Sequence, residues 1–277
     1  MTPEEYCQQK ASQSGSSFYY SFLFLPQHRR RAIIALYAFC REVDDVVDEC
    51  HDPQIATTKL VWWRHELDNL YAGNPQHPVT CALLPILAEF NLAQEQLLEI
   101  IDGMEMDLLQ SRYLNFKALS LYCYRVASVV GLLSAEIFGY QDRKTQKYAH
   151  DLGMALQLTN IIRDVGEDAG MGRIYLPLDE LQRFEVTADD ILNARYTDNF
   201  RRLMEFQIER AEQYYTQAMS ELPNGDRKTQ RPGLVMAGIY RTLLDEIKRE
   251  NCQVLTQRIA LTPVRKLWIA WRTWIKE

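Results

Sequence analysis

The stretch that decides the fold is residues 37–49, which reads YAFCREVDDVVDE. An α-helix repeats every 3.6 residues, so side chains three or four positions apart share one face. Here that face carries a phenol, a guanidinium and two carboxylates, contributed by Tyr37, Arg41, Asp44 and Asp48. Asp45 and Glu49 are rotated by about 100° from it, and we expect both to face water.

A second acidic stretch, QLTNIIRDVGED, occupies residues 157–168. Its oxygen-bearing side chains also recur at helical spacing, as Gln157, Asn160, Asp164 and Asp168. Two such helices can face each other across one cavity. Because two carboxylates about 6 Å apart repel each other by roughly 3 kcal/mol at an effective dielectric constant near 20, an otherwise apolar bundle would need a cation between the rows.

Mg²⁺ suits such a site, since it binds one or two carboxylates and completes its shell with water and substrate phosphate. It also stabilises a departing phosphate group as a Lewis acid. A di-iron bundle instead carries Glu-x-x-His on two helices, and this motif is absent from the chain. A solvated helix face, or pairing with Arg41, could explain the first stretch alone. The two stretches together favour Mg²⁺.

Composition excludes some classes of protein. The net charge of −6 gives no reason to expect nucleic acid as the main partner. The six cysteines form no CxxC pair, the first residues lack the pattern of a signal peptide, and there is no run of 18 apolar residues. We therefore expect a cytoplasmic protein without a spanning helix.

Apolar residues at helical spacing predominate, and β-strand alternation is almost absent, so the sequence predicts an all-α protein. With neither a repeat nor a long linker, we expect one domain over residues 1–277. The region 166–190 is predicted to be the longest irregular one, and long ordered loops are often functional. Helices are predicted at about 27–50, 56–72, 80–90, 94–111, from 116 through 121–139, 143–165, 197–221 and 231–256.

Three motifs carry a family resemblance: REVDDVVDE at 41–49, YCYRVASVVG at 122–131 and QLTNIIRDVGEDAGMGRIYLP at 157–177. In this order they resemble the trans-isoprenyl diphosphate head-to-head synthases, the squalene/phytoene synthase family, over most of the chain. The resemblance implies an all-α isoprenoid synthase fold with a central hydrophobic cavity. It also implies Mg²⁺-dependent ionisation of an allylic diphosphate and 1-1′ coupling to a second one.

The resemblance also assigns roles to residues. It places Asp44 and Asp48 in the first metal motif, and Asn160, Asp164 and Asp168 in the second. Tyr122 matches the tyrosine proposed to guide proton removal after coupling, so it joins Asp44, Asp48 and Asp164 as a catalytic candidate. The substrate-binding candidates are Ser17, Phe18, Tyr37, Arg41, Gln157, Arg173, Tyr240, Arg258 and Lys266.

The same chemistry needs a dry tunnel that protects an allylic cation from water. Aromatic side chains can stabilise such a cation, although most buried aromatic residues belong to an ordinary core. Our candidates for the tunnel wall are Phe18, Phe22, Tyr37, Tyr122 and Leu133.

One departure from the family pattern bears on the substrate. Ser128 stands where many members have glycine in YCxxVAGxVG. With the stretch at 14–26, SGSSFYYSFLFLP, it resembles the bacterial enzymes that make presqualene diphosphate for hopanoids. We therefore expect two farnesyl diphosphates as substrates, presqualene diphosphate passed to later pathway enzymes, and no requirement for NADPH.

Other functions remain open at this point. A phytoene synthase would join two geranylgeranyl diphosphates, and a squalene synthase would complete the NADPH-dependent step. A terpene cyclase also uses aspartate-rich helices, but the motif at 122–131 fits it poorly. A non-catalytic helical scaffold would be expected to lose its metal ligands first, and here all of them are present.

The last stretch, VRKLWIAWRTWIK at 264–276, places apolar side chains at helical spacing among basic ones. The apolar set is Leu267, Trp268, Trp271 and Ile275, and the basic set is Arg265, Lys266, Arg272 and Lys276. This composition is typical of a helix at the membrane surface, and equally of a terminal helix packed on the bundle. Peripheral contact with the inner face of the membrane is therefore an open alternative.

Overall fold

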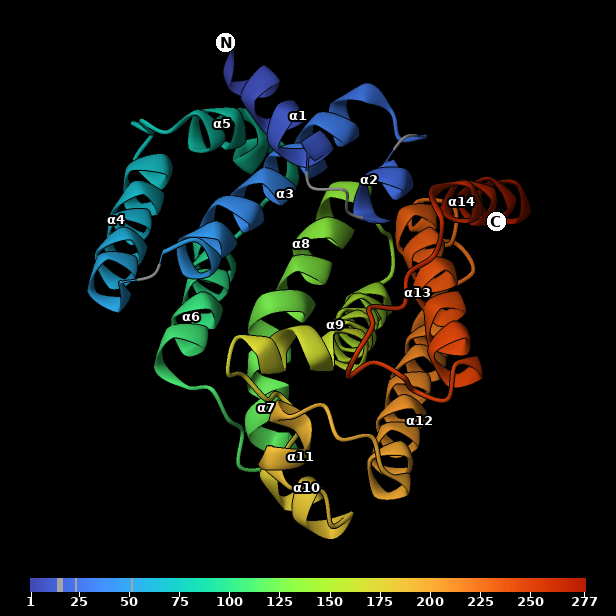
Figure 1. Cartoon of the computed structure of the whole chain (residues 1–277). Coiled ribbons are helices and arrows are strands. Elements are labelled where there is room, and N and C mark those ends of the chain that lie inside the picture. Colours follow the sequence, from blue (N-terminus) through green and yellow to red (C-terminus); the bar gives the residue numbers. More distant parts are fainter. Residues whose placement is uncertain (14–16, 23, 51) are drawn as a thin grey trace.

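Helices form nearly all the regular structure of the computed structural model (Figure 1), which describes residues 1–277 except 14–16, 23 and 51, and only the backbone of 17, 19 and 20. Within this part there is no strand; a single parallel bridge joins Arg112 and Ile174. The all-α prediction is confirmed. The elements are α1 (Pro3–Gln13), α2 (Ser17–Phe22), α3 (Gln27–Asp48), α4 (Pro53–Tyr71), α5 (Pro78–Phe90), α6 (Gln94–Leu109), α7 (Phe116–Cys123), the π-turn η1 (Tyr124–Ser128), α8 (Val129–Phe138), α9 (Lys144–Gly170), α10 (Leu178–Arg183), α11 (Ala188–Leu192), α12 (Asp198–Glu221), α13 (Arg231–Arg249) and α14 (Pro263–Lys276).

The buried side chains form two groups. One comes mainly from α1, α3, α4, α5, α6 and α8, and the other from α7, α9, α12, α13 and the segment after α13. In Figure 1 the first group lies mostly to the left and the second mostly to the right. A cavity of about 620 Å³ is lined by residues from both groups. The helices that carry the acidic stretches, α3 and α9, are walls of this cavity.

The apolar stretch at 116–138 is not one continuous α-helix as predicted. A π-turn at Tyr124–Ser128 separates α7 from α8. By length and composition, Phe116–Phe138 is long and apolar enough to cross a membrane. In the fold, however, Tyr122, Cys123 and Val129 are buried in the two cores.

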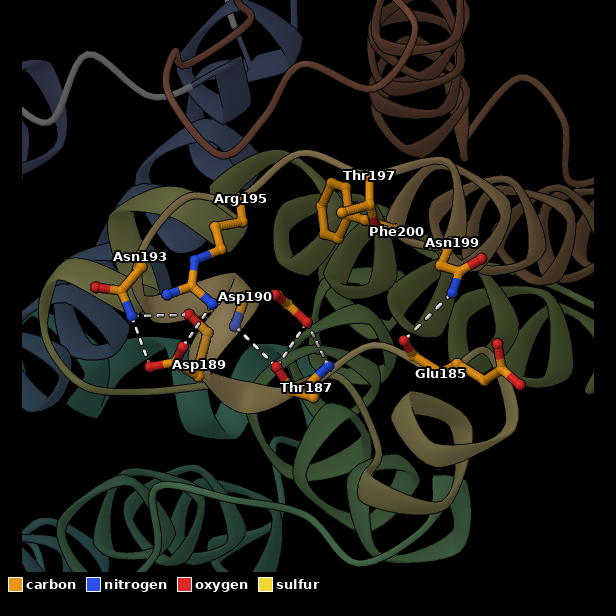
Figure 2. Close-up of polar contacts among 9 residues, drawn as sticks. All are labelled: Glu185, Thr187, Asp189, Asp190, Asn193, Arg195, Thr197, Asn199 and Phe200. Carbon is orange, nitrogen blue, oxygen red and sulfur yellow. Dashed lines mark hydrogen bonds and ion pairs between the residues drawn. The ribbon is translucent and has the colours of Figure 1, made fainter.

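The region 166–190 is more regular than predicted. Helix α9 continues to Gly170, and α10 and α11 follow. Figure 2 shows why α11 forms: the Thr187 side chain accepts from the Asp190 N–H at 3.1 Å, and the Asp190 carboxylate accepts from the Thr187 N–H at 2.9 Å. This reciprocal capping box satisfies two amides at the start of the helix. Thr197 likewise accepts from the Phe200 N–H and starts α12.

The predicted helix at 231–256 ends early, at Arg249. Asn251 and Cys252 both have a positive φ, which ends the helical path. The chain then packs onto α9, where a Cβ on Gly166 would lie 2.4 Å from the Leu255 carbonyl oxygen. This close approach brings the segment before α14 against the second acidic stretch.

Glu66 on α4 organises the turn into α5. Its Oε1 accepts from the backbone N–H groups of Gln76 at 2.7 Å and His77 at 2.8 Å, and from the Thr80 hydroxyl. Burial alone would raise the pKa of this carboxyl, but the hydrogen bonds outweigh it and lower the pKa.

We expect Glu66→Ala to lower the free energy of unfolding by about 2 kcal/mol, because two part-buried backbone N–H groups and the buried Thr80 hydroxyl lose this acceptor. Urea unfolding at neutral pH measures this, with the exposed Glu89→Ala as control. The pKa of the Glu66 carboxyl is lower in the folded protein than in the unfolded chain. Its ionised form therefore stabilises the fold at pH values above the unfolded-state pKa, and this stabilisation is lost as the pH falls through the folded-state pKa. The difference in the free energy of unfolding between wild type and Glu66→Ala should therefore become smaller at acidic pH. A difference that does not change with pH would contradict this role of Glu66.

Candidate active site

The acidic face of α3 points into the cavity, as the spacing predicts. Tyr37, Arg41 and Asp44 line it. Asp48, one turn further on, lies outside the lining with its side chain 47% exposed. Asp45 does not face water as predicted: its carboxylate lies 2.7 Å from Lys10 and 2.6 Å from Arg41, and only 14% of the side chain is exposed. The water-facing prediction holds for Glu49, which is exposed.

The second row is on α9. Gln157, Asn160 and Asp164 line the same cavity, whereas Asp168 lies one turn beyond the lining. Asn160 donates to the Gln157 side-chain oxygen at 3.2 Å, but its own Oδ1 is buried without a hydrogen-bond partner in the described structure. The two rows therefore meet across one cavity, with one carboxylate from each in its lining.

Arginines separate the carboxylates. Arg41 lies 2.5 Å from Asp44, Arg258 lies 3.2 Å from Asp164, and Arg173 lies 3.6 Å from Asp48. Arg163 also pairs with Asp164. Among the described residues, no three acidic, histidine or cysteine side chains are grouped closely enough to hold an ion. Asp44, Asp48 and Asp164 therefore each lie beside a guanidinium group in this structure.

The donor set nevertheless fits a divalent cation. Burial and then the neighbouring Asp48 raise the pKa of Asp44 to about 7. Burial, followed by Asp164 and Asp107, raises the pKa of Asp168 to about 7. These are sites where negative charge is insufficiently compensated. The unpartnered Asn160 oxygen adds a neutral ligand of the kind that hard cations bind.

Basic groups crowd the polar end of the cavity. Arg163, Arg258 and Lys266 line it together with Tyr240. Burial lowers the pKa of Lys266, and the guanidinium groups of Arg163 and Arg258 lower it further. Cations this close repel one another unless an anion binds between them. The arrangement suits a diphosphate, which Arg binds in bidentate fashion.

Away from this end the cavity is apolar. Phe18, Phe22, Tyr37 and Tyr122 line it, as predicted. Leu133 does not line it and packs in the core instead. The Ser17 side chain lies outside the described part of the structure. The cavity thus combines an ionic end with an apolar interior, as a prenyl diphosphate requires.

Tyr122 lies at the cavity wall and donates to the Asp107 carboxylate at 2.8 Å. The Tyr175 hydroxyl donates to the other oxygen of Asp107, also at 2.8 Å. Burial raises the pKa of Asp107 to about 6, although the two tyrosine hydroxyls act in the opposite direction. Asp107 and Arg163 are not among the residues predicted from the sequence. Arg163 falls within the second acidic stretch and could have been found there, whereas Asp107 precedes the motif of its partner and has no signal of its own.

Ser128, the departure that favoured presqualene diphosphate, lies outside the cavity lining. It is fully buried, and its hydroxyl donates to the His150 carbonyl oxygen on α9 at 2.9 Å. Its role in this fold is to attach η1 to α9. Its side chain therefore does not form part of the wall along which a prenyl chain would lie.

Two acidic helices that line one cavity with apolar side chains are what the motif resemblance predicted for a helical synthase of isoprenyl diphosphates. Residues 11–265 match the family model described as squalene/phytoene synthase. The chain therefore belongs to the squalene/phytoene synthase family, whose members join isoprenyl diphosphates head to head and are typically dependent on divalent metals.

Relatives and solved structures agree with this family. The 15-cis-phytoene synthase of Synechocystis sp. is 38% identical, over 98% of this chain and 84% of that protein. The phytoene synthase of Arthrospira platensis is 38% identical, over 95% and 89%. A dehydrosqualene synthase crystal structure superposes with a TM-score of 0.87 at 27% identity, over 98% and 95%. The squalene synthase HpnC from Alicyclobacillus acidocaldarius gives 0.81 at 30% identity, over 90% and 94%.

Proposed function

We propose that the chain is a phytoene synthase that couples two molecules of geranylgeranyl diphosphate 1-1′. The observation that carries this substrate is the pair of curated relatives at 38% identity, both named phytoene synthases and both matched over most of their length. They favour geranylgeranyl diphosphate over the farnesyl diphosphate and presqualene diphosphate predicted from the motifs. The cavity supports the reaction class, because it joins an ionic end to an apolar interior.

The residues of the site would have three roles: binding the diphosphates, excluding water and binding the metal. Arg41, Arg163 and Arg258 would bind the diphosphates together with Lys266 and Arg173, while Phe18, Phe22 and Tyr37 keep water from the prenyl chains. Mg²⁺ held by Asp44, Asp48, Asn160, Asp164 and Asp168 would supply Lewis-acid stabilisation of the departing diphosphate. Gln157 would orient Asn160, to which it is hydrogen-bonded, and Tyr240 would hold Arg163 at the cavity wall.

Tyr122 would act where the new bond forms. In the first coupling step the donor loses diphosphate and its C1 bonds to the double bond of the acceptor. A proton then leaves, and the electron pair of the broken C–H bond closes a three-membered ring. Loss of the second diphosphate then lets this ring rearrange to the 1-1′ bond, and loss of a second proton gives the hydrocarbon with a central double bond. A buried phenol oxygen at the wall can stabilise the cation and guide the departing proton.

Product analysis tests the substrate. Purified protein is incubated with Mg²⁺ and either geranylgeranyl or farnesyl diphosphate, with and without NADPH, and the extracted lipid is identified by mass spectrometry. We expect a hydrocarbon with the carbons of both geranylgeranyl chains, formed without NADPH and abolished by EDTA. Product from farnesyl diphosphate alone would overturn the proposal and favour the presqualene diphosphate or squalene alternatives.

We also propose that this cytoplasmic protein touches the inner face of the membrane through α14. Its buried face, with Ile269 and Ala270, packs on the bundle, while Val264, Leu267, Trp268, Trp271 and Ile275 are exposed along one stripe. Arg272 and Lys276 flank this stripe. Trp side chains beside cations suit the boundary of an anionic bilayer. A water-insoluble product would benefit from release there.

The double substitution Trp268→Ser/Trp271→Ser should lower the bound fraction several-fold in co-sedimentation with vesicles containing phosphatidylglycerol. Trp62→Ser, which alters an exposed tryptophan on α4, is the matched control. It should bind as wild type does. Equal binding by both variants would show that α14 only packs on the bundle.

A further inference from the structure

Helix α6 places a carboxylate directly behind the tyrosine of the cavity wall. Both oxygens of Asp107 accept a phenol hydroxyl at 2.8 Å, one from Tyr122 and one from Tyr175. The rings of these tyrosines stack 5.2 Å apart, and Tyr113 packs against both. Of this group only Tyr122 reaches the cavity lining. The carboxylate is thus half-buried behind the cavity wall, which it contacts through Tyr122, and its charge also bears on Asp168 and Asp44.

The backbone is built to bring Asp107 and Tyr122 together. Gly103 lies one turn before Asp107 on α6, and a Cβ there would be 2.7 Å from Val126 Cγ1 and 3.0 Å from Arg125 Cβ. This glycine lets α6 approach the π-turn that directly follows Tyr122 on the chain. Single π-turns within α-helices occur frequently at functional sites.

The hydrogen bond determines which side of the Tyr122 oxygen faces the substrate. A phenol has one proton and acceptor lone pairs on the same oxygen. Because the proton points to Asp107, the lone pairs are left for the cavity. Without this acceptor the hydroxyl could turn its proton toward the cavity, and its dipole would then repel a carbocation.

Resting on the function proposed above, we propose that Asp107 is a positioning residue that holds the Tyr122 hydroxyl with its oxygen lone pairs toward the reacting carbons. The carboxylate binds no substrate and transfers no group in this role. The proposal therefore requires that most of the effect of substituting Asp107 be lost when the Tyr122 hydroxyl is absent.

A double-mutant cycle tests this requirement. Asp107→Leu should lower kcat by roughly tenfold to a hundredfold with little change in KM, as expected for a misaligned catalytic group. In a Tyr122→Phe background its effect on kcat should be much smaller. Multiplicative effects of the two substitutions would overturn the proposal, because Asp107 would then act independently of Tyr122.

Two further variants control for folding. Asp107→Asn keeps one acceptor oxygen and should recover part of the lost kcat. Glu105→Gln alters a carboxylate on the same helix that pairs with Arg64 instead, and it should retain wild-type kcat. Circular dichroism confirms that each variant is folded. An Asp107→Asn enzyme no better than Asp107→Leu would contradict the role of the hydrogen bond.

An NMR measurement tests the positioning role of Asp107 independently of the proposed function. With ¹³Cζ-labelled tyrosine, the Tyr122 signal is identified by its loss in Tyr122→Phe. It should shift in Asp107→Asn and stay in place in Glu105→Gln, whether or not the protein turns over any diphosphate. An unmoved signal overturns the positioning role. A shifted signal in a protein that couples no diphosphate would instead refute the proposed function alone.

Discussion

Replacing Asp44 with asparagine is expected to lower kcat by about a thousandfold, as for removal of a charge-stabilising group from a water-excluded site. Asp44 is the one carboxylate that α3 contributes to the cavity lining. The substitution should not weaken the fold. Burial and Asp48 disfavour the charged form of Asp44, as its raised pKa shows, so a neutral amide relieves an unfavourable charge. Steady-state turnover and urea unfolding measure the two effects.

Asp45 provides a matched control for this experiment. It is the next residue on the helix and shares the Arg41 partner, but its other contact is Lys10, and neither Asp45 nor Lys10 lines the cavity. Asp45→Asn should keep turnover within a few-fold of wild type and lose about 1 kcal/mol of stability with its ion pairs. Near-normal turnover of Asp44→Asn at saturating Mg²⁺, or equal losses in both variants, would count against the metal assignment.

The site residues that recur at helical spacing could be predicted from the sequence, because side chains three or four residues apart lie on the same face of a helix. On α3, Tyr37, Arg41 and Asp44 recur at three and four residues and reach one cavity. The same rule worked for Asn160 and Asp164 on α9. It could not show where the lining ends along each helix. Asp48 and Asp168 belong to the same rows but lie outside the lining, since the cavity spans only part of each helix.

Contacts between distant segments could not be predicted in this way. Arg258 reaches Asp164 because the chain after α13 leaves the helical path and packs on Gly166. Asp107 meets Tyr122 only because α6 and the π-turn approach each other at Gly103. Neither contact can be predicted from the spacing of residues within one helix. The resemblance drawn from Ser128 has a similar limit: the relatives favour phytoene synthases over the presqualene diphosphate enzymes it pointed to, and its side chain bonds to the neighbouring helix.

The second large effect is expected from a single methyl group at Gly153. A Cβ there would lie 2.6 Å from Ser128 Cα and 2.7 Å from the Ala127 carbonyl oxygen. These are backbone atoms of η1, so α9 and η1 would have to separate. Overpacking of this kind costs typically about 1–3 kcal/mol, and we expect Gly153→Ala to lose that much stability in urea unfolding.

The same separation should also impair turnover. Helix α9 carries Asn160 and Asp164, and η1 follows directly on Tyr122, so pushing the two apart misaligns groups on facing walls. A misplacement of about 1 Å can cost a hundredfold in rate, and we expect a loss of that order in kcat. Gly170→Ala is the matched control on α9, since its Cβ would meet nothing within 4 Å. It should leave turnover unchanged and stability equal or slightly raised. If the two alanine variants behaved alike, the tight contact between α9 and η1 would not be what holds the two walls in register.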